Sequence, residues 1–408
     1  MVFSPDTQRA IAQQAEQLAP QMTRFLRELL EIPSYSAQEG PRIARIKQEM
    51  EAVGFDEIKV DGLGSILGRI GSGSRVIAMD AHIDTVEPGD LSAWPRDPFK
   101  GEVKDGVIFG RGAADQTGAM ASMVYAAKII KALGLEGDYQ LWITGTVMEE
   151  DCDGLCWDYI IKENILRPEV VVITEPTDLG VYRGHRGRME IEIRVAGRSC
   201  HGAHPELGDN AIYKMAPIIA DVERLNESLA ASADPFLGKG SCTISVIRST
   251  SPSQCAVADS CAIHVDRRLT AGETLELAVA QLADLPSVKK ARGEVVVLEY
   301  ARAAYTGLTY PMRKYYPTWT LPEDHPVVRA GARVAEAALG QPARVARWGF
   351  STNGIATCGL HDIPTIGFGP GNEIHAHTTE DQVPIEHLVK AAQFYAMFPK
   401  MYLNEVAR

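Results

Sequence analysis

Basic residues are in the minority in this chain. Lysine and arginine together number 41, against 53 aspartate and glutamate residues, so the formal net charge is −12 over 408 residues. Proteins that bind nucleic acid or anionic membranes by charge need clustered lysine and arginine. Long apolar runs are also missing, and none approaches the ~18 residues that a membrane-spanning helix needs. We therefore expect neither nucleic acid nor a membrane among the partners.

The sequence also lacks a secretion signal and a paired cysteine framework. Its first ten residues, MVFSPDTQRA, have neither the charged start nor the apolar core of a signal peptide. The seven cysteines are scattered and odd in number, unlike the set of a disulfide-rich secreted protein. Cys152 and Cys156 have no second Cys/His pair at zinc-finger spacing after them. We expect ordinary thiols and a cytoplasmic location.

Strands that alternate with helices dominate both ends of the chain. Apolar runs predict buried strands, and amphipathic stretches predict helices between them. The predicted strands are 58–60, 65–70, 76–81, 140–147, 170–174 and 364–368, and the predicted helices 5–30, 41–53, 118–132, 155–163, 326–339 and 385–402. This order indicates an α/β/α domain with a mixed sheet, in which functional groups gather at the carboxyl ends of strands.

A different pattern interrupts that domain. The run RMEIEIRV at 188–195 alternates polar and apolar residues, which is typical of a strand with one wet face. Further strands are predicted at 242–247 and 262–267, with helices at 209–226 and 273–285. This β-α-β-β-α-β order predicts an inserted α+β domain of ferredoxin-like type. We place the domain parts at 1–183, 184–299 and 300–408.

Acidic and imidazole side chains follow several of the predicted strands. His82 and Asp84 are two residues apart, so both can work on one side of a strand end, the ring on a metal and the carboxylate holding the ring. Asp115 follows a glycine-rich turn and precedes a helix, where it is either an N-cap or a carboxylate aimed into a cleft. Either of two nearby histidines, His375 and His377, can be a ligand, with the other in a supporting or substrate-binding role.

Carboxylates complete the pattern. Glu149, Glu150, Asp151 and Asp153 follow one strand and would repel one another without compensating cations. In a metal site, one of the adjacent glutamates serves as ligand and the other as general base. Glu175 follows another apolar strand. Mixed carboxylate and imidazole ligands suit zinc, or cobalt and manganese, and two ions ~3.5–4 Å apart would balance this cluster.

These motifs resemble the family of dinuclear zinc enzymes that includes aminoacylase, acetylornithine deacetylase, succinyl-diaminopimelate desuccinylase and carboxypeptidase G. The matching segments are HIDTV, FGRGAADQTG, MEED, TEP and GPGNEIHAHTTED. The resemblance implies hydrolysis of an amide bond in a small N-acyl amino acid or a short peptide that bears a carboxylate. It implies that Asp115 bridges two metal ions and that four further residues are metal ligands: His82, Glu150, Glu175 and His377. It also implies that Glu149 is the general base and Asp84 the partner of His82.

The inserted segment resembles the lid and dimerisation domain of the same family. The stretch from Gly197 to Glu206, GRSCHGAHPE, matches the motif whose histidine, here His201, reaches the active site of a neighbouring subunit. Arg268 matches the family's substrate-side arginine, which can hold a carboxylate bidentately, although a structural ion pair is the alternative. The resemblance thus implies a homodimer formed through the lid.

Some positions depart from the family pattern. Thr117 stands where lysine is usual, Asn353 where many members have aspartate, and Cys255 lies in a stretch that replaces an asparagine-containing one. None of these removes a ligand. The segments HIDTVEPGD and PSQCAVAD resemble those of the family's hydrolase branch that is associated with selenium metabolism. Hydrolysis of ureido or carbamoyl compounds is the alternative activity, and a catalytically silent metal- or substrate-binding protein is the alternative from another class.

Overall fold

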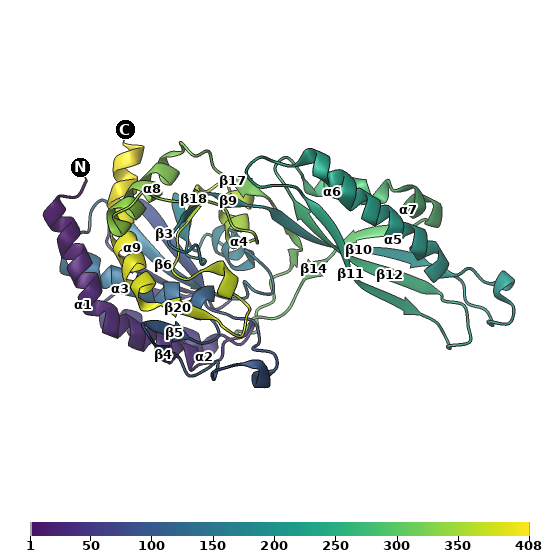
Figure 1. Ribbon diagram of the computed structural model, residues 1–408, viewed down its shortest axis with the longest axis horizontal. Coiled ribbons are helices and arrows are strands. Elements are labelled where there is room, and N and C mark those ends of the chain that lie inside the picture. Colours follow the sequence, from purple (N-terminus) through teal and green to yellow (C-terminus); the bar gives the residue numbers. More distant parts are fainter. Residues whose placement is uncertain (1, 408) are drawn as a thin grey trace.

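The computed structural model describes residues 2–407 and has two parts, each with its own core (Figure 1). The larger part is built on a mixed sheet with the strand order β1-β2-β6-β3-β7-β19-β8-β18. These strands are β1 (Glu57–Val60), β2 (Ile66–Ile70), β3 (Arg75–His82), β6 (Tyr139–Thr146), β7 (Val170–Ile173), β8 (Val181–Tyr182), β18 (Val345–Ala346) and β19 (Thr365–Gly367). The prediction of an α/β domain with a mixed sheet is confirmed.

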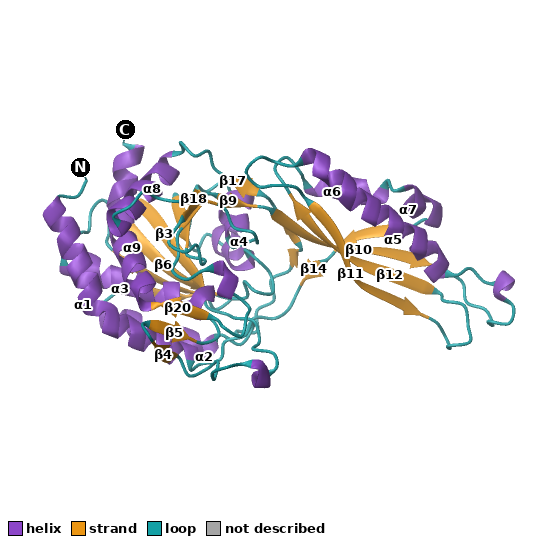
Figure 2. Ribbon diagram, viewed as in Figure 1, coloured by secondary structure: helices purple, strands orange, loops and turns teal. Residues whose placement is uncertain are grey.

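Helices cover this sheet (Figure 2). They are α1 (Pro5–Leu30), α2 (Gly40–Val53), α3 (Gly118–Ala132), α4 (Leu155–Lys162), α8 (Pro326–Leu339) and α9 (Ile385–Val406). Helix α1 begins where the Ser4 hydroxyl accepts the Thr7 N–H, and it buries an apolar stripe that includes Ile11, Leu18 and Leu29. The stripe packs on α3 and α9, which explains why the amphipathic pattern predicts this helix so well.

Short strands complete the larger part and the region where it joins the smaller part. They are β4 (Glu102–Lys104), β5 (Val107–Phe109), β9 (Gly184–His185), β14 (Glu299–Tyr300), β15 (Met312–Arg313), β17 (Trp319–Thr320) and β20 (Gln382–Pro384). The central strands β3, β6 and β7 run parallel. Their carboxyl ends therefore meet at one edge of the sheet, which is where the candidate site lies.

The smaller part extends away from the larger one as a separate sheet with helices on one face (Figure 1). Its strands follow the order β11-β12-β10-β13, all antiparallel, which is the ferredoxin-like arrangement. Its elements are β10 (Gly187–Ala196), α5 (Ala211–Ser228), β11 (Ser241–Thr250), β12 (Ser260–Leu269), α6 (Leu275–Ala283), α7 (Pro286–Ala291), β13 (Glu294–Val297) and β16 (Tyr315–Tyr316). We call this part the lid.

The lid strands alternate as the RMEIEIRV pattern predicts. Met189, Ile191 and Ile193 of β10 are fully buried against the helices, while the residues between them face the polar side of the sheet. The sheet also takes a strand from beyond residue 299, since β16 pairs with β10. Among residues 2–407, no further strand pairs with the outer edge of β11, and Val246 and Ile247 of this strand are exposed.

Within residues 2–407, none of the helices is long and apolar enough to cross a membrane. The seven cysteines are free thiols.

Candidate metal centre and substrate pocket

His82, the last residue of β3, is the centre of the first group of ligand-type side chains. Its ring is almost fully buried, and Nε2 lies 2.9 Å from Asp115 Oδ1 and 3.5 Å from Glu175 Oε1. One ligand atom from each of the three residues lies within 4.8 Å of the others. Glu175 Oε2 is buried and has no hydrogen-bond partner among the described residues. This geometry can hold one cation.

Asp115 is shared with a second group. His377 Nε2 lies 3.3 Å from Asp115 Oδ2 and 3.0 Å from Glu150 Oε2, and these three residues also form a compact set. Its two carboxylate oxygens face the two groups separately, Oδ1 towards His82 and Oδ2 towards His377. His375 lies against Gln382 instead, so the geometry groups His377, and not His375, with the acids.

Glu149 lies beside both groups and belongs to neither. It is buried, and its Oε2 is 3.9 Å from His82 Nε2. The backbone N–H groups of Glu149 and Glu150 donate to the two oxygens of Asp84, at 3.2 and 3.1 Å. Glu150 is a member of the second group, whereas Glu149 lies near His82 and lines the pocket described below.

Asp84 supports His82 differently from the strand-based expectation. His82 Nδ1 is 2.9 Å from the backbone carbonyl of Asp84, whereas the nearest carboxylate oxygen is 3.5 Å away. The reason is that β3 ends at His82, so the alternation of a strand does not continue to Asp84. The carboxylate of Asp84 instead binds the loop of Glu149 and Glu150 and accepts the Ser36 hydroxyl at 2.6 Å.

The electrostatics of the cluster follow from burial and crowding. Burial raises the pKa of both Glu149 and Glu175 well above the usual range, with His82 opposing the rise. Burial by itself lowers the pKa of His82, but the carboxylates of Glu175 and Glu149 raise it well above its usual value. Hydrogen bonds to Asp115 and Glu150 raise the pKa of His377 to about 10. These groups compete for protons that bound cations would replace, because metal ligands bind in their deprotonated forms.

The donor set therefore fits two divalent cations. Three buried or half-buried carboxylates and two imidazoles lie around one shared aspartate, and a buried glutamate oxygen still lacks a partner within the described chain. Carboxylate and imidazole ligands of this kind suit Zn²⁺ and its first-row neighbours.

The cluster lies on the wall of a pocket of about 370 Å³ between the larger part and the lid. Arg268 lines this pocket, as the lid resemblance implies, but its guanidinium is already bound to Asp266 in a bidentate ion pair, at 2.8 and 3.0 Å. Arg188 lines it too, since it is the cross-strand partner of Arg268. Arg188 also donates to Asp153 at 2.9 Å.

Sequence reasoning missed Arg188, Phe350, Ser351 and Glu373, all of which line the pocket. Only the strand register of β10 and β12 points to Arg188. Ser351 donates a hydrogen bond to Asp153, and no motif in the sequence marks it.

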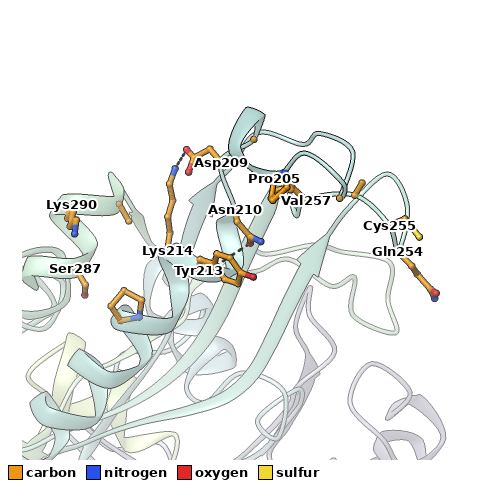
Figure 3. A pocket seen from close by; sticks show the side chains of 15 residues that line it. Pro205, Asp209, Asn210, Tyr213, Lys214, Gln254, Cys255, Val257, Ser287 and Lys290 are labelled. Carbon is orange, nitrogen blue, oxygen red and sulfur yellow. Dashed lines mark hydrogen bonds and ion pairs between the residues drawn. The ribbon is translucent and has the colours of Figure 1, made fainter.

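His201 lies outside this pocket. It is exposed on a lid loop, where it pairs with Ala256 in an isolated bridge. A larger cavity of about 770 Å³, lined in part by Gly202 of the same loop, lies at the start of α5 (Figure 3). Its lining includes Tyr213, Cys255 and the Lys214–Asp209 ion pair, and it lacks the clustered acids and imidazoles of the smaller pocket. We therefore place the chemistry in the smaller one.

The two departures near the cluster have defined partners. The Thr117 hydroxyl accepts from Arg42 Nη1 at 3.2 Å. The Asn353 amide donates to Asp80 at 2.9 Å and to Thr146 at 3.1 Å, while its carbonyl accepts the Gly154 N–H at 2.8 Å. Both residues join neighbouring elements behind the cluster, and neither reaches the pocket.

Paired ligand groups at the strand ends of an α/β sheet, under an inserted lid, define the class of metal-dependent hydrolases. The model of peptidase family M20/M25/M40 matches residues 78–400, and the chain belongs to this family. The uncharacterized protein YgeY of Escherichia coli (strain K12) is 53% identical over 395 residues, covering 97% of this chain and 98% of that protein.

Two further comparisons are more distant. Acetylornithine deacetylase of Proteus mirabilis (strain HI4320) is 28% identical over 378 residues, covering 89% of this chain and 92% of that enzyme. The crystal structure of the Bacillus subtilis YXEP protein, a dinuclear metal binding peptidase from the M20 family, matches with a TM-score of 0.70 at 15% identity, covering 95% of this chain and 99% of that one. At that identity the likeness confirms the fold.

Proposed function

We propose that this protein is a metal-dependent hydrolase that cleaves an amide bond in a small N-acyl amino acid or a short peptide. The observation that carries the proposal is the pair of ligand groups that share Asp115, with Glu149 beside them and outside both. His82, Asp115 and Glu175 would hold one ion, and Asp115, Glu150 and His377 would hold the other. Zn²⁺ is the favoured metal, with Co²⁺ and Mn²⁺ as the related choices.

The chain's own residues then divide the work of hydrolysis. When bound, the cations polarise the scissile carbonyl and lower the pKa of a water molecule. Glu149 takes the proton of that water and later gives it to the leaving nitrogen. The water oxygen bonds to the carbonyl carbon and the C–N bond breaks, which gives a carboxylic acid and an amine. Glu149 has then carried one proton from the water to the nitrogen and is ionised again. The second water proton passes from the new carboxylic acid to the amine, so the products are a carboxylate and an ammonium group. Asp84 contributes by fixing the His82 ring and the glutamate loop.

The lid side of the pocket supports a substrate with a carboxylate. Arg268 presents a guanidinium that can bind a carboxylate bidentately once Asp266 yields it. The similar acetylornithine deacetylase is named for a small acylated amino acid, which fits the same size of ligand. Ureido and carbamoyl amides are the second substrate class to test, because the residues described do not distinguish one planar amide carbonyl from another.

We further propose that two chains form a homodimer through their lids. The open edge of β11 needs a covering partner, and His201 is exposed on the lid, away from the ligand groups of its own chain. In a two-fold dimer, His201 of each subunit would stabilise the oxyanion in the other subunit's site.

The test is a hydrolysis screen on the Zn²⁺- or Co²⁺-loaded protein, using N-acetyl amino acids, dipeptides and N-carbamoyl amino acids with mass-spectrometric detection. We expect turnover of at least one panel member and loss of it in Glu149→Ala, with two metal ions per chain retained because Glu149 is base and not ligand. Glu163→Ala, which removes a glutamate just after α4, is the matched control and should stay active.

Two results would contradict the proposal. Near-wild-type turnover by Glu149→Ala would remove the general base from the mechanism. Inactivity across the whole panel, in protein that binds two ions, would favour the binding-protein alternative.

A further inference from the structure

Glu39 is a buried carboxylate that does not serve its own helix. It stands at the N-cap of α2, but within residues 2–407 its side chain makes no hydrogen bond to the N–H groups of that helix. It is fully buried. The ordinary role of an acid at this position, capping the helix, therefore does not account for it.

The side chain of Glu39 reaches a loop 109 residues further along the chain. Its Oε1 accepts the backbone N–H of Met148 at 3.0 Å and that of Ala37 at 2.8 Å. Both residues have left-handed backbone conformations, with φ of +62° for Met148 and +66° for Ala37. Residues other than glycine adopt this conformation only at a cost in free energy. Such a conformation persists when surrounding contacts hold it, and Glu39 supplies one of those contacts to each residue.

Met148 directly precedes Glu149 and Glu150. Three successive N–H groups, those of residues 148, 149 and 150, are thus bound by buried carboxylates: the first by Glu39 and the next two by Asp84. The side chain of Glu149 can point towards the pocket only while this turn keeps its shape. A displacement of about 1 Å at a catalytic group can cost about 10²-fold in rate.

The segment that carries Glu39 makes further contacts behind the cluster. Ser36 donates to Asp84 at 2.6 Å, and buried Arg42 donates to the carbonyl of Ile83 at 3.0 Å. Residues 36–42 therefore hold both the loop after β3 and the loop after β6. Glu39 is the member of this segment that contacts the loop of the two glutamates directly.

We propose that Glu39 is a positioning residue, whose carboxylate fixes the turn at Met148 and so orients Glu149 for proton transfer. This rests on the proposed role of Glu149 as the general base. The hydrogen bonds of the Glu39 carboxylate go to the backbone N–H groups of Ala37 and Met148 and not to any candidate metal ligand. Its oxygen matters as a hydrogen-bond acceptor, and the proposal predicts that a neutral acceptor of the same shape can replace it.

The experiment compares Glu39→Gln with Glu39→Met, using the panel substrate with the highest kcat/KM. Glutamine keeps an oxygen for the Met148 N–H, whereas methionine has a similar length and no oxygen. We expect Glu39→Gln to retain kcat within about 3-fold and Glu39→Met to lose 10- to 100-fold in kcat, with KM unchanged within 2-fold. Both should bind two metal ions per chain.

Glu49→Met is the matched control. Glu49 is also a buried glutamate of α2, but its carboxylate binds Tyr125 and Arg45 instead of the loop after β6. Its replacement removes a buried acid from the same helix and should leave kcat within 3-fold.

A second readout does not depend on turnover. Hydrogen–deuterium exchange of peptides that contain residues 148–150 should be faster in Glu39→Met than in wild type and unchanged in Glu39→Gln. If Glu39→Met does not fold, Glu39→Asp takes its place, because the shorter side chain withdraws the oxygen from Met148.

Three outcomes would overturn the proposal: wild-type kcat and exchange in the folded variant that lacks the contact, equal losses in Glu39→Gln and Glu39→Met, or an equal loss in Glu49→Met. Failure of the proposed function is separate, since it shows as activity in Glu149→Ala, whereas the exchange readout tests Glu39 in either case.

Discussion

His185 gives the sharpest prediction about pH and stability. It lies on β9, where the lid joins the larger part, and it is fully buried. Its Nε2 accepts hydrogen bonds from Trp319 Nε1–H at 2.8 Å and from the Thr352 N–H at 3.1 Å. Its Nδ1 lies 2.8 Å from the carbonyl of Arg186, to which it donates. This arrangement needs the neutral ring, because a protonated Nε2 has no lone pair to accept with.

The size of the effect follows from the pKa. Burial lowers the pKa of His185 to about 4, with the Arg186 carbonyl opposing the change slightly, whereas an unfolded histidine has a pKa of about 6.5. Since the folded-state pKa is the lower one, the stability that depends on the neutral ring is fully present above pH 6.5. It is lost progressively as the pH falls from 6.5 to 4. At about 1.4 kcal/mol per unit, this group removes about 3 kcal/mol from the free energy of unfolding.

The assay compares wild type with His185→Gln, both stripped of metal by a chelator, in urea denaturation between pH 7 and pH 4. Tryptophan fluorescence reports the unfolding, and two of the five tryptophans, Trp319 and Trp348, have rings 5.2 and 6.0 Å from the imidazole. At pH 7 we expect the variant to be less stable by about 1 kcal/mol, the net value of a lost hydrogen bond. Below pH 6.5 the wild type should lose about 3 kcal/mol more than the variant does.

The control is His204→Gln, which replaces an exposed histidine of the lid and should leave the pH profile of the wild type unchanged. Parallel pH profiles for wild type and His185→Gln would refute the reasoning, since they would mean that His185 does not titrate differently on folding.

Two further predictions concern the proposed activity. Arg268→Ala should raise KM about 10- to 100-fold for a carboxylate substrate, the effect of a lost charged hydrogen bond of 1.5–3 kcal/mol, and should not change KM for its carboxamide analogue; equal increases for both would remove Arg268 from substrate binding. Mixing inactive Glu149→Ala subunits with inactive His201→Ala subunits should partly restore activity, because one site in each hybrid dimer carries neither change. No recovery after demonstrated subunit exchange would show that His201 does not act across an interface.

Local patterns predicted most of the fold because burial and periodicity act over short distances. Residues 5–30, 118–132 and 326–339 were predicted as helices and are observed with those bounds. Helices α1 and α8 combine an apolar stripe with clear end signals, whereas α3 is an apolar helix that is buried on nearly all sides. The candidate ligand groups could also be predicted from the sequence. Each follows an apolar strand or a glycine-rich turn, and parallel strands bring such positions to one edge.

Contacts between distant segments were beyond the same reasoning. Arg188 faces the pocket because of its register with Arg268, which no local pattern in β10 reports. Glu39 contacts Met148 across 109 residues. Asp84 was expected to hold His82 with its carboxylate, but β3 ends at His82, two residues before Asp84, and the backbone carbonyl of Asp84 is the nearer contact. In each case the deciding quantity is where a strand stops or which strand lies beside it.

The loop after β6 is where the chemistry and the lid are mechanically connected. It carries Glu149 and Glu150, and four residues after Glu149 it carries Asp153, which binds Arg188 of β10 at 2.9 Å and also accepts from Ser351. The Arg188–Asp153 pair is largely buried, and removing one partner of such a pair leaves the other charge buried and unpaired. A hinge motion that moved β10 would therefore either move this loop with it or separate the Arg188–Asp153 ion pair.

Glu39 and Asp84 belong to the larger part and bind the start of the same loop. The loop is therefore held by the larger part at one end and by the lid at the other. The orientation of Glu149, the proposed general base, is therefore tied to the position of the lid.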